Sequence, residues 1–284
     1  MKAFSVSIIL TVLLSGLSPF ISAQILDSPR DGVFDKIHLQ EKKPIPYAPI
    51  READVMWEKR IWRIIDLRQK INHPFYYPEV AQKNWRNFMT VVMDAVREGT
   101  LTAYDASKDD QFLVPMTYQE IEKKYKKTDT VPVYDPENPE KILEWNIVQE
   151  DFNSTFVKQI KLKEDWFFDK QRSQMDVRIL GICPMYDMYD ENDNFLGREP
   201  MFWLYFPEAR PVFAQSIVFN RSNGAEDRTY DELFWKRMFG SYIIKEENVF
   251  DRDINKYATQ MDALLEAERI KNELFEYEHE LWEF

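Results

Sequence analysis

The stretches "FVKQIKLKEDWFF" (156–168) and "QMDVRILGICPMYDMY" (174–189) decide the fold that we expect for this chain. In the first stretch, Phe156, Ile160 and Leu162 share one side, while lysines and a glutamine share the other, as in a strand with one buried face. The second stretch alternates at first and then becomes apolar on both sides. Both stretches therefore predict β-strands.

Further elements can be assigned on either side of this pair. "YDENDNFLG" (189–197) is a polar turn cluster and "EPMFWLYF" (199–206) is another strand-like run, which together predict an antiparallel meander. Before it, "WRNFMTVVMDAVREG" (85–99) has apolar residues at helical spacing and ends on Gly99, a residue typical of helix ends. "TLTAY" (100–104) predicts a short strand.

Two segments begin with the same helix start signal. In "TYQEIEKKY" (117–125) and "TYDELF" (229–234), a threonine is followed three residues later by glutamate, which is a capping box. Each segment follows a strand-like run and a polar loop. Two interpretations are open. Residues 52–128 and 142–250 are two related α/β lobes on either side of a polar connector (128–141), or the similarity arose by chance, because capping boxes are common.

The stretch "IREADVMWEKRIWRIIDLRQK" (50–70) predicts an amphipathic helix that ends near His73-Pro74. At helical spacing, Trp57 falls within a broad apolar arc that would face the core. Trp62 instead projects among charged side chains on the opposite face. On that face the Trp62 side chain would be exposed to water unless another segment or another protein packed over it.

Three covers for Trp62 are open. The preceding "KKPIPYAPI" (42–50) has three prolines, which favour an extended arm over residues 24–51, and Pro46 or Pro49 would stack on the indole. A partner protein is the second cover. Burial of the whole helix is the third, and it conflicts with the cost of burying charged side chains. We favour the arm.

The last segment, 251–284, predicts a long helix with a narrow apolar seam, because Leu274, Tyr277 and Leu281 step by three and four residues. From Tyr257 onward there are eight acidic and two basic residues, a net charge of −6 out of −12 for the chain. Such a helix suits docking on a partner with basic character.

The overall expectation is an α+β fold in which helices pack on an antiparallel meander, with an extended N-terminal arm and a long C-terminal helix. The divisions that we expect are a signal peptide over residues 1–23, the arm over 24–51, an α+β core over 52–250 and the acidic helix over 251–284. The signal peptide is indicated by a positive start, an apolar stretch too short to span a membrane, and a small-residue end.

Composition restricts the function classes. The chain has 284 residues, of which 44% are hydrophobic, so it can bury a sizeable core. Its net charge of −12 argues against nucleic acid and against adhesion to anionic lipid, and no later segment predicts direct membrane insertion. Cys183 is the one cysteine, so no internal disulfide can form, and its apolar surroundings predict a small buried hydrophobe.

No pattern in the sequence points to catalysis. The histidines at 38, 73 and 279 lack zinc-site spacing, and the glycines are too scattered for a phosphate-binding loop. The acidic turn at 189–197 lacks the glycine and glutamate of a calcium-binding EF-hand. We therefore expect no catalytic, cofactor-binding or metal-binding residues. The aromatic excess (8 Trp, 14 Tyr and 20 Phe) fits protein interfaces or stacking on sugar rings.

Three long stretches closely resemble the gliding-motility protein family GldN, also called PorN, of Bacteroidetes. They are "PIREADVMWEKRIWRIIDLRQKINHPFYYP" (49–78), "IKLKEDWFFDKQRSQMDVRILGICPM" (160–185) and "FWLYFPEARPVFA" (202–214). The acidic end "LLEAERIKNELFEYEHELWEF" (264–284) is similar to the end of that family. The resemblance covers most of the chain from Pro44 onward.

The resemblance implies a non-enzymatic periplasmic component of the type IX secretion system, peripheral to the outer membrane. GldN-like proteins assemble with the lipoprotein GldK (PorK) into large rings and contact the periplasmic part of the motor protein GldM (PorM). No catalytic residue of the family carries over. The alternative is a periplasmic carbohydrate-binding or carbohydrate-active protein.

On this interpretation the surplus aromatic and seam residues bind partners or a neighbouring copy in the ring. The candidate partner-binding residues are Tyr47, Pro49, Trp62, Leu274, Tyr277 and Leu281.

Overall fold

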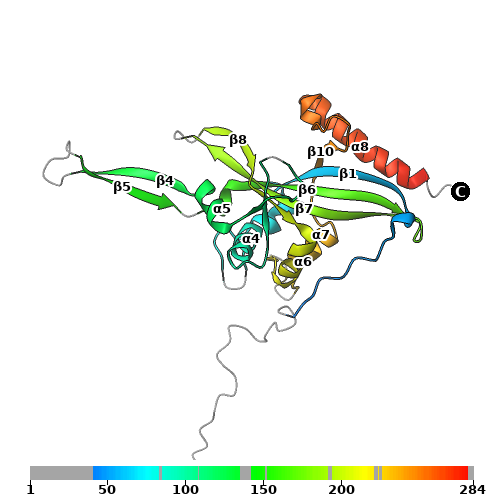
Figure 1. Cartoon of the computed structure of the whole chain (residues 1–284), viewed down its shortest axis with the longest axis horizontal. Helices are drawn as coiled ribbons and strands as arrows, with labels where there is room; N and C mark the ends of the chain where they lie inside the picture. The colour runs from blue at the N-terminus through cyan, green and yellow to red at the C-terminus, as the bar shows by residue number, and fades with distance from the viewer. Residues whose placement is uncertain are drawn as a thin grey trace, which may run out of the picture. The chain divides into compact units, whose positions relative to one another are not determined.

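Eight antiparallel strands form the main sheet of the molecule (Figure 1). They follow the order β10-β1-β6-β7-β9-β2-β3, and β8 also pairs with β7. Their bounds are β1 (Val55–Asp66), β2 (Ala103–Asp105), β3 (Pro115–Met116), β6 (Val157–Asp169), β7 (Gln174–Tyr189), β8 (Phe195–Pro200), β9 (Phe202–Tyr205) and β10 (Tyr242–Glu246). The predicted α+β fold with an antiparallel meander is confirmed.

The computed structural model describes residues 41–280 apart from 83–84, 108, 135–141, 151, 191–193, 221–222 and 224–225. The expected signal peptide (1–23) lies outside the described residues. So do the arm before residue 41 and Leu281.

Strands β6 and β7 are the pair from which the meander was predicted. They pair from Val157 opposite Tyr186 to Asp169 opposite Gln174, and β7 covers the predicted stretch residue for residue. The third predicted run is divided, because β8 ends at Pro200 and β9 begins at Phe202.

Within the described residues, six α-helices accompany the sheet. Their bounds are α3 (His73–Tyr76), α4 (Phe88–Arg97), α5 (Tyr118–Tyr125), α6 (Phe206–Gln215), α7 (Tyr230–Trp235) and α8 (Met261–Glu280), with 3-10 turns at Glu52–Asp54, Lys70–Asn72, Ser154–Phe156 and Ile254–Lys256. Both predicted capping boxes are present, since the Thr117 and Thr229 side chains accept from the backbone N–H of Glu120 and Glu232. Gly99 follows α4 with a φ of +73°, as its position predicts.

The stretch over residues 50–70 was wrongly predicted to be a helix, because its central part is strand β1. β1 pairs with β10 on one side and with β6 on the other, so it is an interior strand. From Ile61 to Asp66 both faces of β1 also meet protein, which removes the alternation that marks a half-buried strand. Several of its charged residues form ion pairs, as between Arg60 Nε and Asp165 Oδ1 at 2.6 Å. Isoleucine, valine and tryptophan favour strands, and sheet pairing overrides the helical spacing.

The two faces of the sheet carry different cores. Residues directly opposite each other on neighbouring strands share a face. Ile65 lies opposite Ile160, whereas Trp62, an odd number of positions away, lies opposite Lys163, so the two pairs face opposite sides.

On the face of Ile65, two apolar clusters form. The main core packs against α4, α6 and α7 and includes Ile65, Phe88, Leu162, Phe213 and Phe234. The second cluster lies under α8, which runs along β10 and β1 in Figure 1, and consists of Ile61, Ile243, Ile254, Ala267, Ile270 and Leu274.

Trp62 lies on the opposite face of the sheet, where another part of the chain covers it. Trp62 is only 5% exposed and packs with Cys183 and Trp203. Its cover is the loop between β2 and β3, from which Phe112 joins this cluster and Asp110 Oδ2 accepts a hydrogen bond from Trp62 Nε1 at 2.6 Å. The prediction that the arm covers Trp62 was therefore wrong.

A glycine lets this loop approach the sheet. A Cβ at position 181 of β7 would lie 2.6 Å from the ring of Phe112, so the phenyl ring needs the space that Gly181 leaves. The loop and the strand are thus fitted to each other at this point.

The described part of the arm, from residue 41 to 50, lies against a different part of the fold. The Tyr47 ring is 5.1 Å from that of Trp235 on α7, and the Arg210 guanidinium lies 4.5 Å from the Tyr47 ring. Lys42 Nζ donates to Glu232 Oε1 at 2.9 Å. These residues pack across the domain, as expected of an arm without a core of its own.

The connector predicted over residues 128–141 was partly wrong. Residues Lys127–Tyr134 form β4, which pairs with β5 (Ile142–Glu150) in a separate two-stranded sheet. The main sheet draws strands from both of the predicted lobes, 52–128 and 142–250. The division into two related lobes stays a prediction.

Candidate protein-binding site

A cleft of about 580 Å³ opens where β1 ends, and we call it the β1 cleft. Residues that follow β1 form one wall, and β6, β7 and β8 supply the rest. Its lining residues are Leu67, Arg68, His73, Tyr76, Tyr77, Glu79, Lys158, Asp187, Tyr189, Phe195 and Arg198. Aromatic rings and long cationic side chains therefore dominate its surface.

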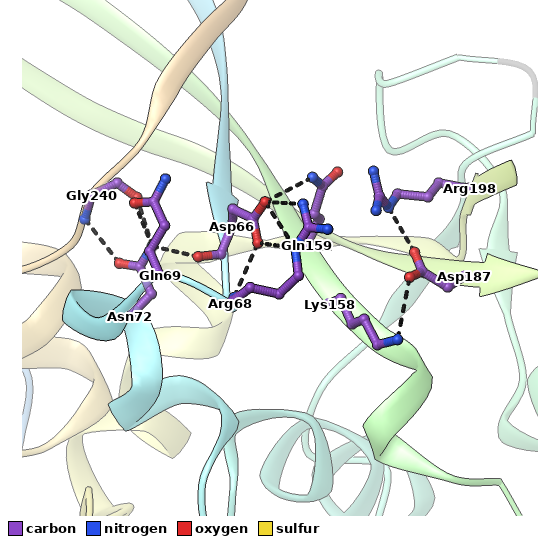
Figure 2. Close-up of polar contacts among 9 residues, drawn as sticks. All are labelled: Asp66, Arg68, Gln69, Asn72, Lys158, Gln159, Asp187, Arg198 and Gly240. Atoms are coloured by element: carbon purple, nitrogen blue, oxygen red, sulfur yellow. Dashed lines mark hydrogen bonds and ion pairs between the residues drawn. The ribbon is translucent and has the colours of Figure 1, made fainter. Parts of the chain in front are cut away.

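One buried carboxylate organises two of these cations (Figure 2). Asp187 on β7 is 2% exposed, and its Oδ1 accepts from Arg198 Nε at 2.7 Å. Lys158 Nζ lies 3.8 Å from Asp187 Oδ2. The side chains of Lys158 and Arg198 are 32% and 27% exposed, so both cations are held in place and still meet solvent.

The same cations lie against aromatic rings of the cleft. Lys158 Nζ donates to the Tyr189 hydroxyl at 2.9 Å, and this hydrogen bond raises the pKa of the ammonium. Arg198 lies 5.2 Å from the ring of Phe195. Apolar and cationic surfaces thus alternate within one concave site.

The end of β1 is fixed by a second polar group. Asp66 accepts from Arg68 Nε at 2.9 Å and from the Arg68 backbone N–H at 3.0 Å, and the Arg68 hydrogen bonds hold the pKa of the Asp66 carboxyl below its usual range. Asn72 donates to the Asp66 carbonyl at 2.7 Å and exchanges hydrogen bonds with the Gly240 backbone. These bonds, drawn in Figure 2, hold the chain after β1 against the segment that leads into β10.

The β1 cleft combines charged and aromatic groups that suit binding of a ligand. Three cations, Arg68, Lys158 and Arg198, line it together with two carboxylates and several aromatic rings. The carboxylates are Glu79 and Asp187, and the N–H donors that the cations keep free suit a ligand that carries carboxylates beside apolar groups. Within the part of the chain that the structure describes, no group of three or more His, Cys, Asp or Glu side chains lies close enough to hold a metal ion.

The second candidate surface is the outer face of α8, defined by Met261, Leu264, Leu265 and Phe275. These four side chains are 60–67% exposed, although they are large and apolar. The inner face of α8 packs on the sheet instead. A helix with one face on its own sheet and an apolar face in solvent is suited to contact another chain.

Two of the predicted partner-binding residues lie on the inner face of α8. Leu274 is buried in the cluster under α8, and the Tyr277 ring stacks on Trp57 with ring centroids 4.7 Å apart. Trp57, which was expected in the core, is therefore only partly buried and holds the end of α8 on β1.

The remaining predicted residues lie far from one another in the fold. Tyr47 is half-buried beside α7, Pro49 is exposed, and Trp62 is buried under the β2–β3 loop. The structure therefore does not gather the five described candidates into one site, and the roles of all six in binding partners stay predictions.

The likeness to known proteins agrees with the resemblance seen in the sequence. A family model described as "Gliding motility associated protein GldN" matches residues 50–283. The chain belongs to the GldN family. No curated protein matches it.

Membership of the GldN family makes the chain a component of the gliding motility and type IX secretion machinery. The matched range contains every residue of the β1 cleft and all of α8. Among the residues that the structure describes, no helix of this GldN-family chain has the length and apolar character needed to cross a membrane.

No pattern in the sequence indicated the β1 cleft. Arg68, Lys158, Asp187 and Arg198 come from distant parts of the chain, and only the strand pairing brings them together. The outer face of α8 did have a signal, because its four apolar residues fall on the side of the helix opposite Ile270 at helical spacing.

Proposed function

We propose that this chain is a non-enzymatic structural subunit of the type IX secretion and gliding motility machinery, located in the periplasm at the inner side of the outer membrane. In this role it forms a ring with a GldK-like lipoprotein and contacts the periplasmic domain of a GldM-like motor protein. The observation that carries the proposal is the match to the GldN family over residues 50–283.

Two surfaces support a role in assembly. The outer face of α8 exposes four large apolar side chains, a pattern typical of surfaces that bind other proteins. The β1 cleft adds a concave cationic and aromatic surface at the other end of β1. A subunit with separate surfaces can contact more than one neighbour at the same time.

The test is recovery of the assembly from cells. A tagged chain is purified from solubilised outer membranes, and mass photometry of the eluate measures the size of the complex. We expect the lipoprotein and the motor protein to co-purify in a particle much larger than one subunit. Recovery of the chain alone, or its presence only in the cytoplasmic fraction, would contradict the proposal.

A matched pair of variants relates the assembly to the outer face of α8. Leu265→Ser with Phe275→Ser removes exposed apolar surface, whereas Val80→Ser removes a similarly exposed side chain elsewhere. We expect the first variant to reduce recovery of at least one partner and the second to leave recovery unchanged.

A further inference from the structure

We propose that the β1 cleft of one subunit receives the acidic segment 275–284 of a second copy of this chain. The inference rests on the proposed function, because it identifies the surfaces that would join neighbouring subunits of a ring. Its grounds are the chemistry of the cleft, the chemistry of the segment and the distance between them on one chain.

The cleft has cationic groups that are not fully used. Within the described residues, Arg198 makes one side-chain hydrogen bond, from Nε to Asp187, although a guanidinium carries five N–H donors. Lys158 donates to Tyr189 and lies near the same carboxylate. Two cations thus share one buried anion, and Glu79 also lines the cleft. The guanidinium donors of Arg198 that remain free leave the cleft able to accept a further carboxylate.

The segment 275–284, "FEYEHELWEF", has the complementary pattern, since four glutamates alternate with aromatic and aliphatic residues. Glu276 and Glu280 are exposed on α8, and among the described residues neither forms an ion pair. Glu273, one turn earlier, instead binds Arg269 at 3.0 Å. Phe275 is 66% exposed, so the segment presents an aromatic ring beside unpaired carboxylates.

The segment cannot reach the cleft of its own chain. Tyr277 stacks on Trp57 at the start of β1, whereas the cleft begins at Leu67, just after β1 ends. Ten residues of strand separate these two points, which is about 33 Å. Any four residues, even fully extended, span at most ~14 Å. Figure 1 shows the same arrangement, with the end of α8 beside the start of β1 and β8 near its other end.

A contact between such different surfaces is head-to-tail. It uses the segment of one copy and the cleft of the next, so an open chain of subunits keeps a free segment at one end and a free cleft at the other until it closes. Repetition of the contact gives a ring if the rotation closes and a filament if it does not. Because the contact pairs opposite charges, salt should weaken it.

The test uses the full chain from Gln24 onward with charge-reversal variants, followed by analytical ultracentrifugation. The segment variant carries Glu276→Lys and Glu280→Lys, and the cleft variant carries Arg198→Glu. A control variant carries Glu98→Lys and Asp262→Lys, which change the net charge equally at exposed acids outside the segment. We expect the segment and cleft variants each to raise the Kd of self-association at least about tenfold, while the control keeps it.

Mixing the two variants gives the sharpest result. One intact cleft and one intact segment remain in the mixture, so we expect the mixture to regain association that neither variant shows alone, at least as far as 1:1 dimers. A segment variant that associates as the unchanged chain does, or a mixture that yields only monomers although both variants are folded by circular dichroism, would overturn the inference. Because Arg198→Glu removes a partner of buried Asp187, Phe195→Ser, which alters an exposed ring of the cleft, serves as a second cleft variant with the same expected loss.

Failure of this inference can be told apart from failure of the proposed function. If the segment and cleft variants still co-purify with the lipoprotein in large particles, the head-to-tail contact is refuted and the ring subunit stands. If the unchanged chain neither self-associates nor co-purifies with the lipoprotein, both fail.

Discussion

Replacing Trp62 by alanine should destabilise the chain far more than replacing Trp57. Trp62 is 5% exposed between Trp203 and the β2–β3 loop, whereas Trp57 is only partly buried under Tyr277. The sequence pattern alone predicts the opposite order, so the pair of variants tests the corrected fold directly.

The magnitudes follow from the contacts. Removing a buried tryptophan costs about 3–5 kcal/mol through lost burial and the cavity left behind. Trp57→Ala loses partial burial and one stacked pair, which is about 0.5–1.5 kcal/mol for the ring contact. Trp62→Phe keeps a ring but removes the donor to Asp110, a loss of about 1–2 kcal/mol because water can reach that partly exposed carboxylate.

The assay is urea denaturation followed by far-UV circular dichroism, which does not depend on the number of tryptophans. Differences in free energy of unfolding come from the midpoint and the slope, and an unchanged slope indicates the same exposed area on unfolding. The reasoning is refuted if Trp62→Ala lies within about 0.5 kcal/mol of the unchanged chain, or if Trp57→Ala costs more.

Three further outcomes are expected. Ile270→Ala should cost about 2–4 kcal/mol in urea denaturation because Ile270 is fully buried, whereas Leu265→Ala on the outer face should change stability by less than about 0.5 kcal/mol. Arg68 holds the pKa of Asp66 below its usual range, so as the pH falls the Asp66 carboxylate is protonated first in the unfolded chain. The stability that Asp66 contributes is therefore complete above about pH 4 and is lost as the pH falls through the pKa of the folded chain. Asp66→Asn should flatten the acid side of a curve of stability against pH. Tyr47→Ala should release residues 41–46, which limited proteolysis would detect as faster cleavage there while the main thermal transition shifts little.

The elements that could be predicted from the sequence are those whose pattern involves residues close together in the chain or one apolar face of a strand. The capping boxes at Thr117 and Thr229 depend on residues three apart, and the structure contains both. Strand β6 was predicted because Ile160 and Leu162 alternate with polar and charged residues in the sequence. The structure shows both apolar side chains buried. Such patterns can be recognised within a few consecutive residues, without knowledge of the tertiary contacts.

The elements that were missed depend on distant partners. β1 is an interior strand, and the spacing of Trp57, Ile61 and Ile65 happens to fit a helix. β4 contains Pro132, which argues against an interior strand but is tolerated in a sheet of two strands, where it lies opposite Trp145. The β1 cleft could not be predicted at all, because Lys158 and Asp187 meet only through the register of β6 and β7.

The buried thiol of Cys183 has a practical consequence. Cys183 is the one cysteine of the sequence, and burial raises its pKa to about 12, so its reactive thiolate is scarce at neutral pH. The natural chain therefore needs no cysteine removed before a new one is introduced at its surface. Maleimide dyes, spin labels or bifunctional cross-linkers would react at the chosen position and leave β7 intact, which allows distances between neighbouring copies to be mapped in the assembled state.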